Sequence, residues 1–135
     1  MSIVSLYLSI TLLTSPASFT ELMSAEEGLW YGNVPWAFEH LERALKLDPK
    51  DTDVLYSLAC LYIEQQEPEK AKPLLEKLTA LDPNHHEAWL LLGTTLWQLG
   101  LTEEATKVNQ AALARDPNSK DGLELQEKLH SKEAP

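Results

Sequence analysis

An Asp-Pro dipeptide returns every 34 residues along this chain, and it constrains the fold more than any other feature of the sequence. It occurs as Asp48-Pro49, Asp82-Pro83 and Asp116-Pro117. Positions seventeen, twelve and five residues before each proline keep the same period. They hold Gly32, Gln66 and Gly100, then Ala37, Ala71 and Ala105, then Ala44, Leu78 and Ala112. A period of this length indicates an array of small units that stack to bury their apolar faces.

Each unit has the pattern of two helices joined by a short turn, which is clearest in the third copy. An apolar stripe recurs there at i, i+3, i+4 and i+7, and a second apolar face follows a glycine. The stripe holds Trp89, Leu92, Gly93 and Leu96, and the second face holds Ala105, Val108 and Ala112. Gly100 ends the first helix, Thr102 is expected to cap the second, and Pro117 ends it.

The other two copies repeat this plan less regularly. In the second copy Pro68 stands in the first turn of the second helix, and Pro73 inside that helix predicts a mild kink. In the first copy residues 35–47 form a good second helix, but the first helix is degenerate. Its expected packing positions are Glu21, Ser24, Ala25 and Gly28.

One more helix is predicted after the third copy, over residues 120–130. Ser119 is expected to cap it, and Leu123 and Leu129 are its expected apolar anchors. Its remaining positions are mostly polar, which is typical of the helix that closes a repeat array against solvent. Residues 131–135 are expected to fray.

The third copy resembles the tetratricopeptide repeat family, whose pattern places Trp, Leu, Gly and Tyr on one helix and Ala, an aromatic, Ala and Pro on the next. The matching residues are Trp89, Leu92, Gly93, Ala105, Ala112 and Pro117, and the departures are Leu96 and Asn109. The second copy matches with Leu58, Tyr62, Ala71 and Pro83, and the first with Ala37, Ala44 and Pro49. The resemblance implies an all-α fold, a right-handed α-solenoid of antiparallel helix pairs. Its repeats would cover 18–51, 52–85 and 86–119, in a domain over 18–130 that follows a hydrophobic segment, 1–17.

In that family the first helices line a concave groove, and a second helical stripe faces it. Two such stripes follow i, i+4 and i+7 in this sequence independently of the family: Tyr56, Cys60 and Ile63, and then Leu90, Thr94 and Trp97. The expected groove residues are Leu22, Leu29, Asp53, Tyr56, Cys60, Ile63, Glu64, Glu87, Leu90, Thr94, Trp97 and Gln98. Apolar side chains rimmed by carboxylates favour an apolar peptide or helix with basic flanks. The sequence leaves open whether the groove is free or filled by the chain itself.

The charge balance narrows the classes of partner. The chain has 21 acidic and 11 basic residues, a net charge of −10, so a nucleic-acid backbone or an anionic membrane surface would be repelled. The family resemblance implies one known binding mode, in which Lys, Asn and Arg side chains of some tetratricopeptide domains clamp a terminal carboxylate. The corresponding positions here carry no cation; they are Tyr56, Ser57, Cys60, Leu90, Leu91 and Thr94. That mode of binding is not expected.

No arrangement of residues predicts catalysis, a metal site or a cofactor. Cys60 is the single cysteine and has no neighbouring base, so a disulfide or a thiolate nucleophile is not expected. The adjacent His85 and His86 lack the i, i+4 spacing of a helical metal site, and a capping, solvent-exposed pair is expected instead.

Residues 1–20 carry no charge and allow three interpretations. They form an extra helix on the first copy, an export signal without a basic start, or an anchor that is short for a membrane span. A cytoplasmic location follows from the first, and an exported or membrane-tethered one from the others. The predicted function is that of a non-catalytic protein-interaction module or small chaperone. The alternative is a self-associating assembly unit that pairs, as a homo-oligomer, through the N-terminal segment.

Overall fold

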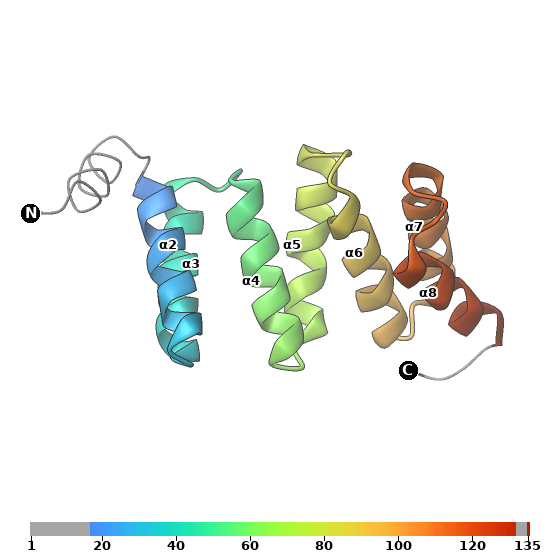
Figure 1. Cartoon of the computed structure of the whole chain (residues 1–135), viewed down its shortest axis with the longest axis horizontal. Coiled ribbons are helices and arrows are strands. Elements are labelled where there is room, and N and C mark those ends of the chain that lie inside the picture. The colour runs from blue at the N-terminus through green and yellow to red at the C-terminus, as the bar shows by residue number, and fades with distance from the viewer. Residues whose placement is uncertain (1–16, 132–134) are drawn as a thin grey trace, which may run out of the picture. The chain divides into compact units, whose positions relative to one another are not determined.

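The computed structural model describes residues 17–131 and Pro135, and all the regular structure in this part of the chain is α-helical (Figure 1). The helices are α2 (Ala17–Trp30), α3 (Val34–Leu47), α4 (Thr52–Glu64), α5 (Pro68–Leu81), α6 (His86–Gln98), α7 (Thr102–Arg115) and α8 (Lys120–Ser131). The predicted all-α class and the predicted helix pairs are confirmed. The interpretations of residues 1–16 lie outside the described residues. The fraying expected over residues 131–135 falls mostly on residues 132–134, which are also outside them, while Ser131 is still part of α8.

The Asp-Pro dipeptides have a structural reason, because each aspartate ends one helix pair and starts the link to the next. The backbone N–H groups of Asp48, Asp82 and Asp116 donate to the carbonyls of Ala44, Leu78 and Ala112 at 2.9, 2.8 and 3.0 Å. Their side-chain Oδ1 atoms accept the N–H groups of Lys50, Asn84 and Asn118 at 3.0, 3.0 and 3.1 Å. The side chain thus closes an Asx turn while the proline prevents the helix from continuing.

The turn inside each pair requires a left-handed residue. Gly32 and Gly100 have φ of 70° and 74°, and Gln66 has φ of 61° at the same position of the second pair. Around Gln66 the N–H of Glu67 donates to the Tyr62 carbonyl at 2.9 Å, which completes the helix end.

Replacing Gln66 with glycine is expected to stabilise the protein by about 1 kcal/mol, because a side chain in the left-handed region costs about that much. Equilibrium urea unfolding checks this. Gln65→Gly is the matched control: Gln65 is exposed and adjacent but is not left-handed, so its replacement should give no gain. Equal effects of the two changes would contradict the argument.

The chain divides into two compact units, one that ends at Val54 and one that begins at Leu55, inside α4. In the first unit α2 packs on α3, and Leu22, Ala25, Ala37 and Leu41 are buried. The helix predicted to be degenerate is therefore continuous, and its buried face agrees with the expected one at Ala25 and Gly28 but not at Glu21 and Ser24. Ser18, Leu22, Ala25 and Gly28 are buried, whereas Glu21 and Ser24 are only partly buried. Glu21 instead contacts His40, with 2.5 Å between Oε2 and Nδ1.

In the second unit one core cluster joins α4, α5, α6, α7 and α8. It consists of Ala59, Ala71, Leu75, Leu92, Leu96, Ala105, Leu125 and Leu129. Pro68 lies in the first turn of α5, as predicted, and α5 continues past Pro73; the kink stays a prediction.

Two predictions about helix ends and anchors in the second unit are wrong. Thr102 does not cap α7: Leu101 is the N-cap, and the Thr102 hydroxyl instead donates to the Gly100 carbonyl at 3.5 Å. On α8 the expected anchor Leu123 is 47% exposed, and Leu125 is buried in its place. The predicted cap of α8 is confirmed, since the N–H of Gly122 donates to Ser119 Oγ at 3.2 Å.

Candidate functional site

Two adjoining pockets on the second unit bring together most of the groove residues that the sequence predicts there. The first has a volume of about 240 Å³ and is lined by Tyr56, Glu87, Leu90, Leu91, Thr94 and Asp121. The second has a volume of about 180 Å³ and is lined by Thr94, Trp97, Asp121, Glu124, Leu125 and Lys128. Because they share Thr94 and Asp121, they form one surface over α4, α6 and α8, which is called the α6 groove below.

The other predicted groove residues lie outside these two pockets. Cys60 and Ile63 are partly buried, and Ile63 packs against the core, while Glu64 and Gln98 are exposed. Three belong to the first unit: Leu29 is 39% exposed and Asp53 is exposed, but Leu22 is only 7% exposed. The prediction that Leu22 faces a groove is therefore wrong, since it packs between α2 and α3 instead.

The sequence interpretation missed the contribution of α8. Asp121, Glu124 and Lys128 recur at i, i+3 and i+7, so they share one face of that helix, and all three line the groove. The same spacing in the sequence would have identified this face. The polar composition of this face predicts only the solvent-exposed surface of a terminal helix.

Tyr56 and Cys60 are kept protonated by their surroundings. Burial raises the pKa of Tyr56 to about 12, helped by the nearby Cys60 and Glu87. Burial also raises the pKa of the Cys60 thiol, although its hydrogen bond with Tyr56 opposes the shift. The Tyr56 ring lies beside that of His85, with 5.0 Å between centroids. The groove thus offers a neutral hydroxyl on an aromatic ring, and no reactive thiolate.

Tyr56 is expected to ionise near pH 12 instead of near pH 10. The measurement is phenolate absorbance against pH for the wild type minus the Tyr56→Phe variant. Because the folded state holds this proton more tightly, its contribution to stability is complete below pH 10 and is lost as the pH rises through about 12. A difference curve with its midpoint at pH 10 would contradict this assignment.

The rim of the α6 groove is acidic. Glu87 and Asp121 are exposed, and Glu124 pairs with the only cation that lines either pocket, Lys128, at 2.8 Å. The hydrogen bond from Lys128 keeps the pKa of Glu124 below its usual value. The Lys128 ammonium also lies 5.4 Å from the centre of the Trp97 ring. Lys128 is therefore already occupied, and the remaining charge on the groove is negative.

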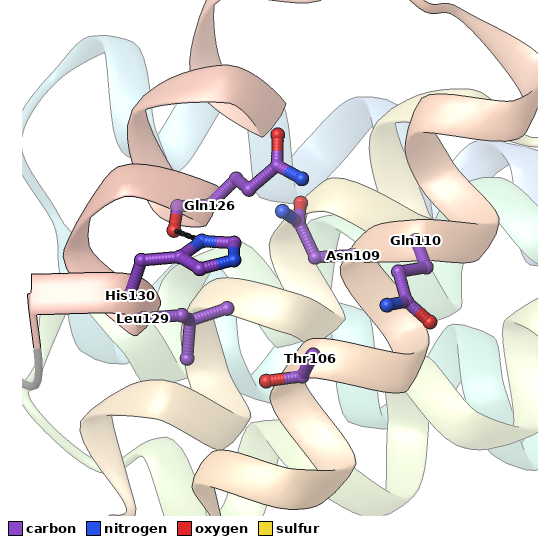
Figure 2. Close-up of a pocket in the computed structure, with 6 residues that line it drawn as sticks. All are labelled: Thr106, Asn109, Gln110, Gln126, Leu129 and His130. Carbon is purple, nitrogen blue, oxygen red and sulfur yellow. Dashed lines mark hydrogen bonds between the residues drawn. The ribbon is translucent and has the colours of Figure 1, made fainter.

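A separate pocket of about 200 Å³ lies between α7 and α8 (Figure 2). Thr106, Asn109 and Gln110 line it from α7, and Gln126, Leu129 and His130 from α8. Asn109, which stands where the family pattern has an aromatic residue, donates from Nδ2 to the Gly122 carbonyl at 2.8 Å. Its Oδ1 is buried without a hydrogen-bond partner. Asn109 therefore fixes one helix contact at the cost of an unpaired oxygen.

The two adjacent histidines have structural roles. His85 caps α6, since its Nδ1 accepts the N–H of Ala88 at 3.2 Å, as the sequence predicts. His86 Nε2 lies 3.7 Å from Asp116 Oδ2. Both rings are partly buried, so the expected solvent exposure is wrong. Over residues 17–131 no three His, Cys, Asp or Glu side chains come together as metal ligands would. No helix in that range is long and apolar enough to cross a membrane.

Comparison with known proteins agrees with the helix-pair architecture of the chain. The sequence profile of the tetratricopeptide repeat matches residues 56–120. No curated protein has a sequence similar enough to be matched.

Solved structures match over most of the chain. The first tetratricopeptide domain of Spaghetti (RPAP3), bound to the HSP90 peptide SRMEEVD, is 17% identical, with a TM-score of 0.80 over 86% of this chain and 92% of that one. The second such domain of human RPAP3, in complex with the HSP70 peptide SGPTIEEVD, is 20% identical, with a TM-score of 0.73 over 84% and 98%. MamA AMB-1 is 26% identical, with a TM-score of 0.80 over 85% of this chain and 63% of that one. Residues 56–120 match the tetratricopeptide repeat family, and the described residues form three helix pairs and a further helix, the fold of these solved tetratricopeptide domains.

Proposed function

We propose that this chain is a non-catalytic interaction module, which binds in its α6 groove a segment of another protein that carries apolar side chains and basic flanks. The observation that supports it most is the composition of the groove. Tyr56, Leu90 and Trp97 offer apolar surface, and Glu87 and Asp121 are carboxylates without a lysine or arginine partner among the described residues. Aromatic residues in a pocket are the usual anchors of a protein interface.

The comparison with RPAP3 sharpens the expected charge of the partner. The HSP90 and HSP70 peptides in those structures both end in Glu-Val-Asp. Such a peptide brings carboxylates, which need cations in the groove that holds them. The α6 groove has one ammonium group, already paired with Glu124, against three carboxylates. The same fold here favours the opposite charge in its ligand, because like charges in contact weaken binding.

The test uses two labelled peptides with the same amphipathic apolar residues and opposite charges on their flanks. Fluorescence polarisation should show binding of the lysine-flanked peptide and weaker binding of its glutamate-flanked counterpart. The double variant Tyr56→Ala/Trp97→Ala should weaken binding of the first peptide by about 100-fold, since each anchor contributes on the order of 1–2 kcal/mol. Helical circular dichroism verifies that the variant is folded.

The matched control is Leu123→Ala, which removes an exposed leucine of α8 that lines neither pocket. It should leave the affinity unchanged. In the variant Glu87→Lys/Asp121→Lys the charge preference should invert. Equal binding of the two peptides, or the same affinity in the wild type and the Tyr56→Ala/Trp97→Ala variant, would overturn the proposal.

A further inference from the structure

Three large aromatic side chains are exposed where α2 ends, in the turn that follows, and in the first turn of α3. Trp30 is 86% exposed, Tyr31 76% and Trp36 46%. A pocket of about 290 Å³ lies at this turn, and its lining residues are Glu27, Gly28, Tyr31, Asn33 and Trp36. All of them belong to the first unit, so this pocket is separate from the α6 groove. Aromatic surface left exposed on one side of a carboxylate-lined pocket is unusual for a purely structural turn.

The indole of Trp36 is held in place before any ligand arrives. Its Nε1–H donates to the Ser24 carbonyl at 3.2 Å, and its ring lies 4.4 Å from that of His40. Gly28 is needed for this position, because a Cβ there would lie 2.5 Å from Trp36 Cδ1. A pre-organised wall lowers the entropy that binding costs.

The pocket also lies at an electrostatically negative helix end. The last turn of α2 contains no basic residue, although the C-terminus of a helix carries partial negative charge. Glu26 and Glu27 stand in or next to that turn, and neither forms an ion pair within the described residues. Carboxylates are unfavourable at this end of a helix unless a cation compensates them.

The second unit shows what normally covers such rings in this protein. The Arg115 guanidinium lies 4.3 Å from the centre of the Trp89 ring, and the Lys128 ammonium lies 5.4 Å from that of Trp97. Lys70 lies 5.4 Å from the centre of the Tyr62 ring. Between residues 17 and 131, no lysine or arginine covers Trp36 or Tyr31 in this way. The α2–α3 turn has the rings and the carboxylate of such a site but not the cation.

We propose that this pocket binds a lysine or arginine side chain of a partner protein, with the alkyl stem against Trp36 and Tyr31 and the cationic head at Glu27. The attraction between a cation and an aromatic face adds to that of the carboxylate and of the helix end. The proposal goes beyond the function of the α6 groove and does not depend on it, because the two surfaces share no residue.

The experiment follows the Trp36 indole N–H by NMR in the full chain, titrated with short glycine peptides. Peptides with a central lysine or arginine should shift that signal in a saturable manner, whereas a central norleucine, the uncharged analogue of lysine, should not. Trp36→Leu should weaken binding about tenfold when it is followed through Glu27 and Tyr31 backbone signals. Glu27→Gln should weaken it about fivefold.

Glu26→Gln is the matched control, because Glu26 is an exposed neighbour that does not line the pocket. It should change the affinity less than Glu27→Gln does. Tyr56→Ala/Trp97→Ala should leave this binding intact even if it abolishes that of the groove. No saturable shift with lysine or arginine, an equal shift with norleucine, or equal effects of the two glutamine variants would overturn the proposal. Tighter binding of free choline than of the lysine peptide would also overturn it, since the occupant would then be a small molecule. A dimer in sedimentation that the Trp36→Leu variant dissociates would overturn it too, since the occupant would then be a second copy of the chain.

Discussion

Leu125→Ala is expected to destabilise the second unit by about 3 kcal/mol, the central value for a buried leucine that leaves a cavity. Leu125 is 4% exposed and belongs to the core cluster that joins α4 to α8. Its Cδ2 lies 3.1 Å from where a Cβ on Gly93 would be, so α6 and α8 approach each other closely around it. The loss should appear in urea unfolding and as faster hydrogen exchange in α6 and α8, because a repeat array propagates a local defect to its nearest neighbours.

Leu123→Ala is the matched control for this prediction. It makes the same chemical change on the same helix at a side chain that is 47% exposed. The expected effect is within about 0.5 kcal/mol, as for other surface substitutions. If the two variants were equally destabilised, the packing face assigned to α8 would be wrong. A large effect of Leu123→Ala alone would indicate that Leu123 is buried, as the sequence predicts.

The α8 face shows which part of the fold could be predicted from the sequence. The repeat period predicts the number of helix pairs and where each begins and ends, because Asp-Pro turns and left-handed residues act locally. Which stripe of a terminal helix is buried depends on its one neighbour. Gly122, Leu125 and Leu129 lie at i, i+3 and i+7 and are buried. Leu123 is as apolar as Leu125, so hydrophobicity alone does not decide which of the two leucines is buried.

The residues of the α6 groove could also be predicted only where the chain keeps the regular repeat. Tyr56, Glu87, Leu90, Thr94 and Trp97 were predicted from copies two and three, which follow the family pattern, and they line the two pockets. The prediction for Leu22 is wrong because the first copy departs from the family pattern. The packing register of the other copies therefore does not apply to α2. The sequence does not predict the acidic side chains of α8 or the aromatic pocket of α2 and α3, because each lies where the chain departs from the regular repeat.

Asn109→Asp is expected to be the most damaging single-charge change in the second unit, at about 3 kcal/mol or more at neutral pH. Asn109 is 2% exposed, and its Nδ2–H donates to the Gly122 carbonyl. A carboxylate at this position lacks that donor and faces a carbonyl oxygen, and no lysine or arginine lines the pocket beside it. Asn109→Leu should cost less than Asn109→Asp, because it removes the unpaired Oδ1 together with the donor to the Gly122 carbonyl and buries no charge.

The pH dependence of the unfolding free energy of Asn109→Asp separates the cost of the buried charge from the cost of the lost helix contact. Burial raises the pKa of the introduced carboxyl in the folded state, so the folded state binds the proton more tightly than the unfolded state. The deficit relative to wild type should therefore be largest at neutral pH and should shrink as the pH falls toward about 4, where the neutral acid can donate to the Gly122 carbonyl. Gln110→Glu adds the same charge at an exposed position of α7 and should change stability by less than about 0.5 kcal/mol. Urea unfolding of the three variants at several pH values measures this. A deficit in Asn109→Asp that did not depend on pH would mean that the helix contact alone, and not the buried charge, accounts for the cost.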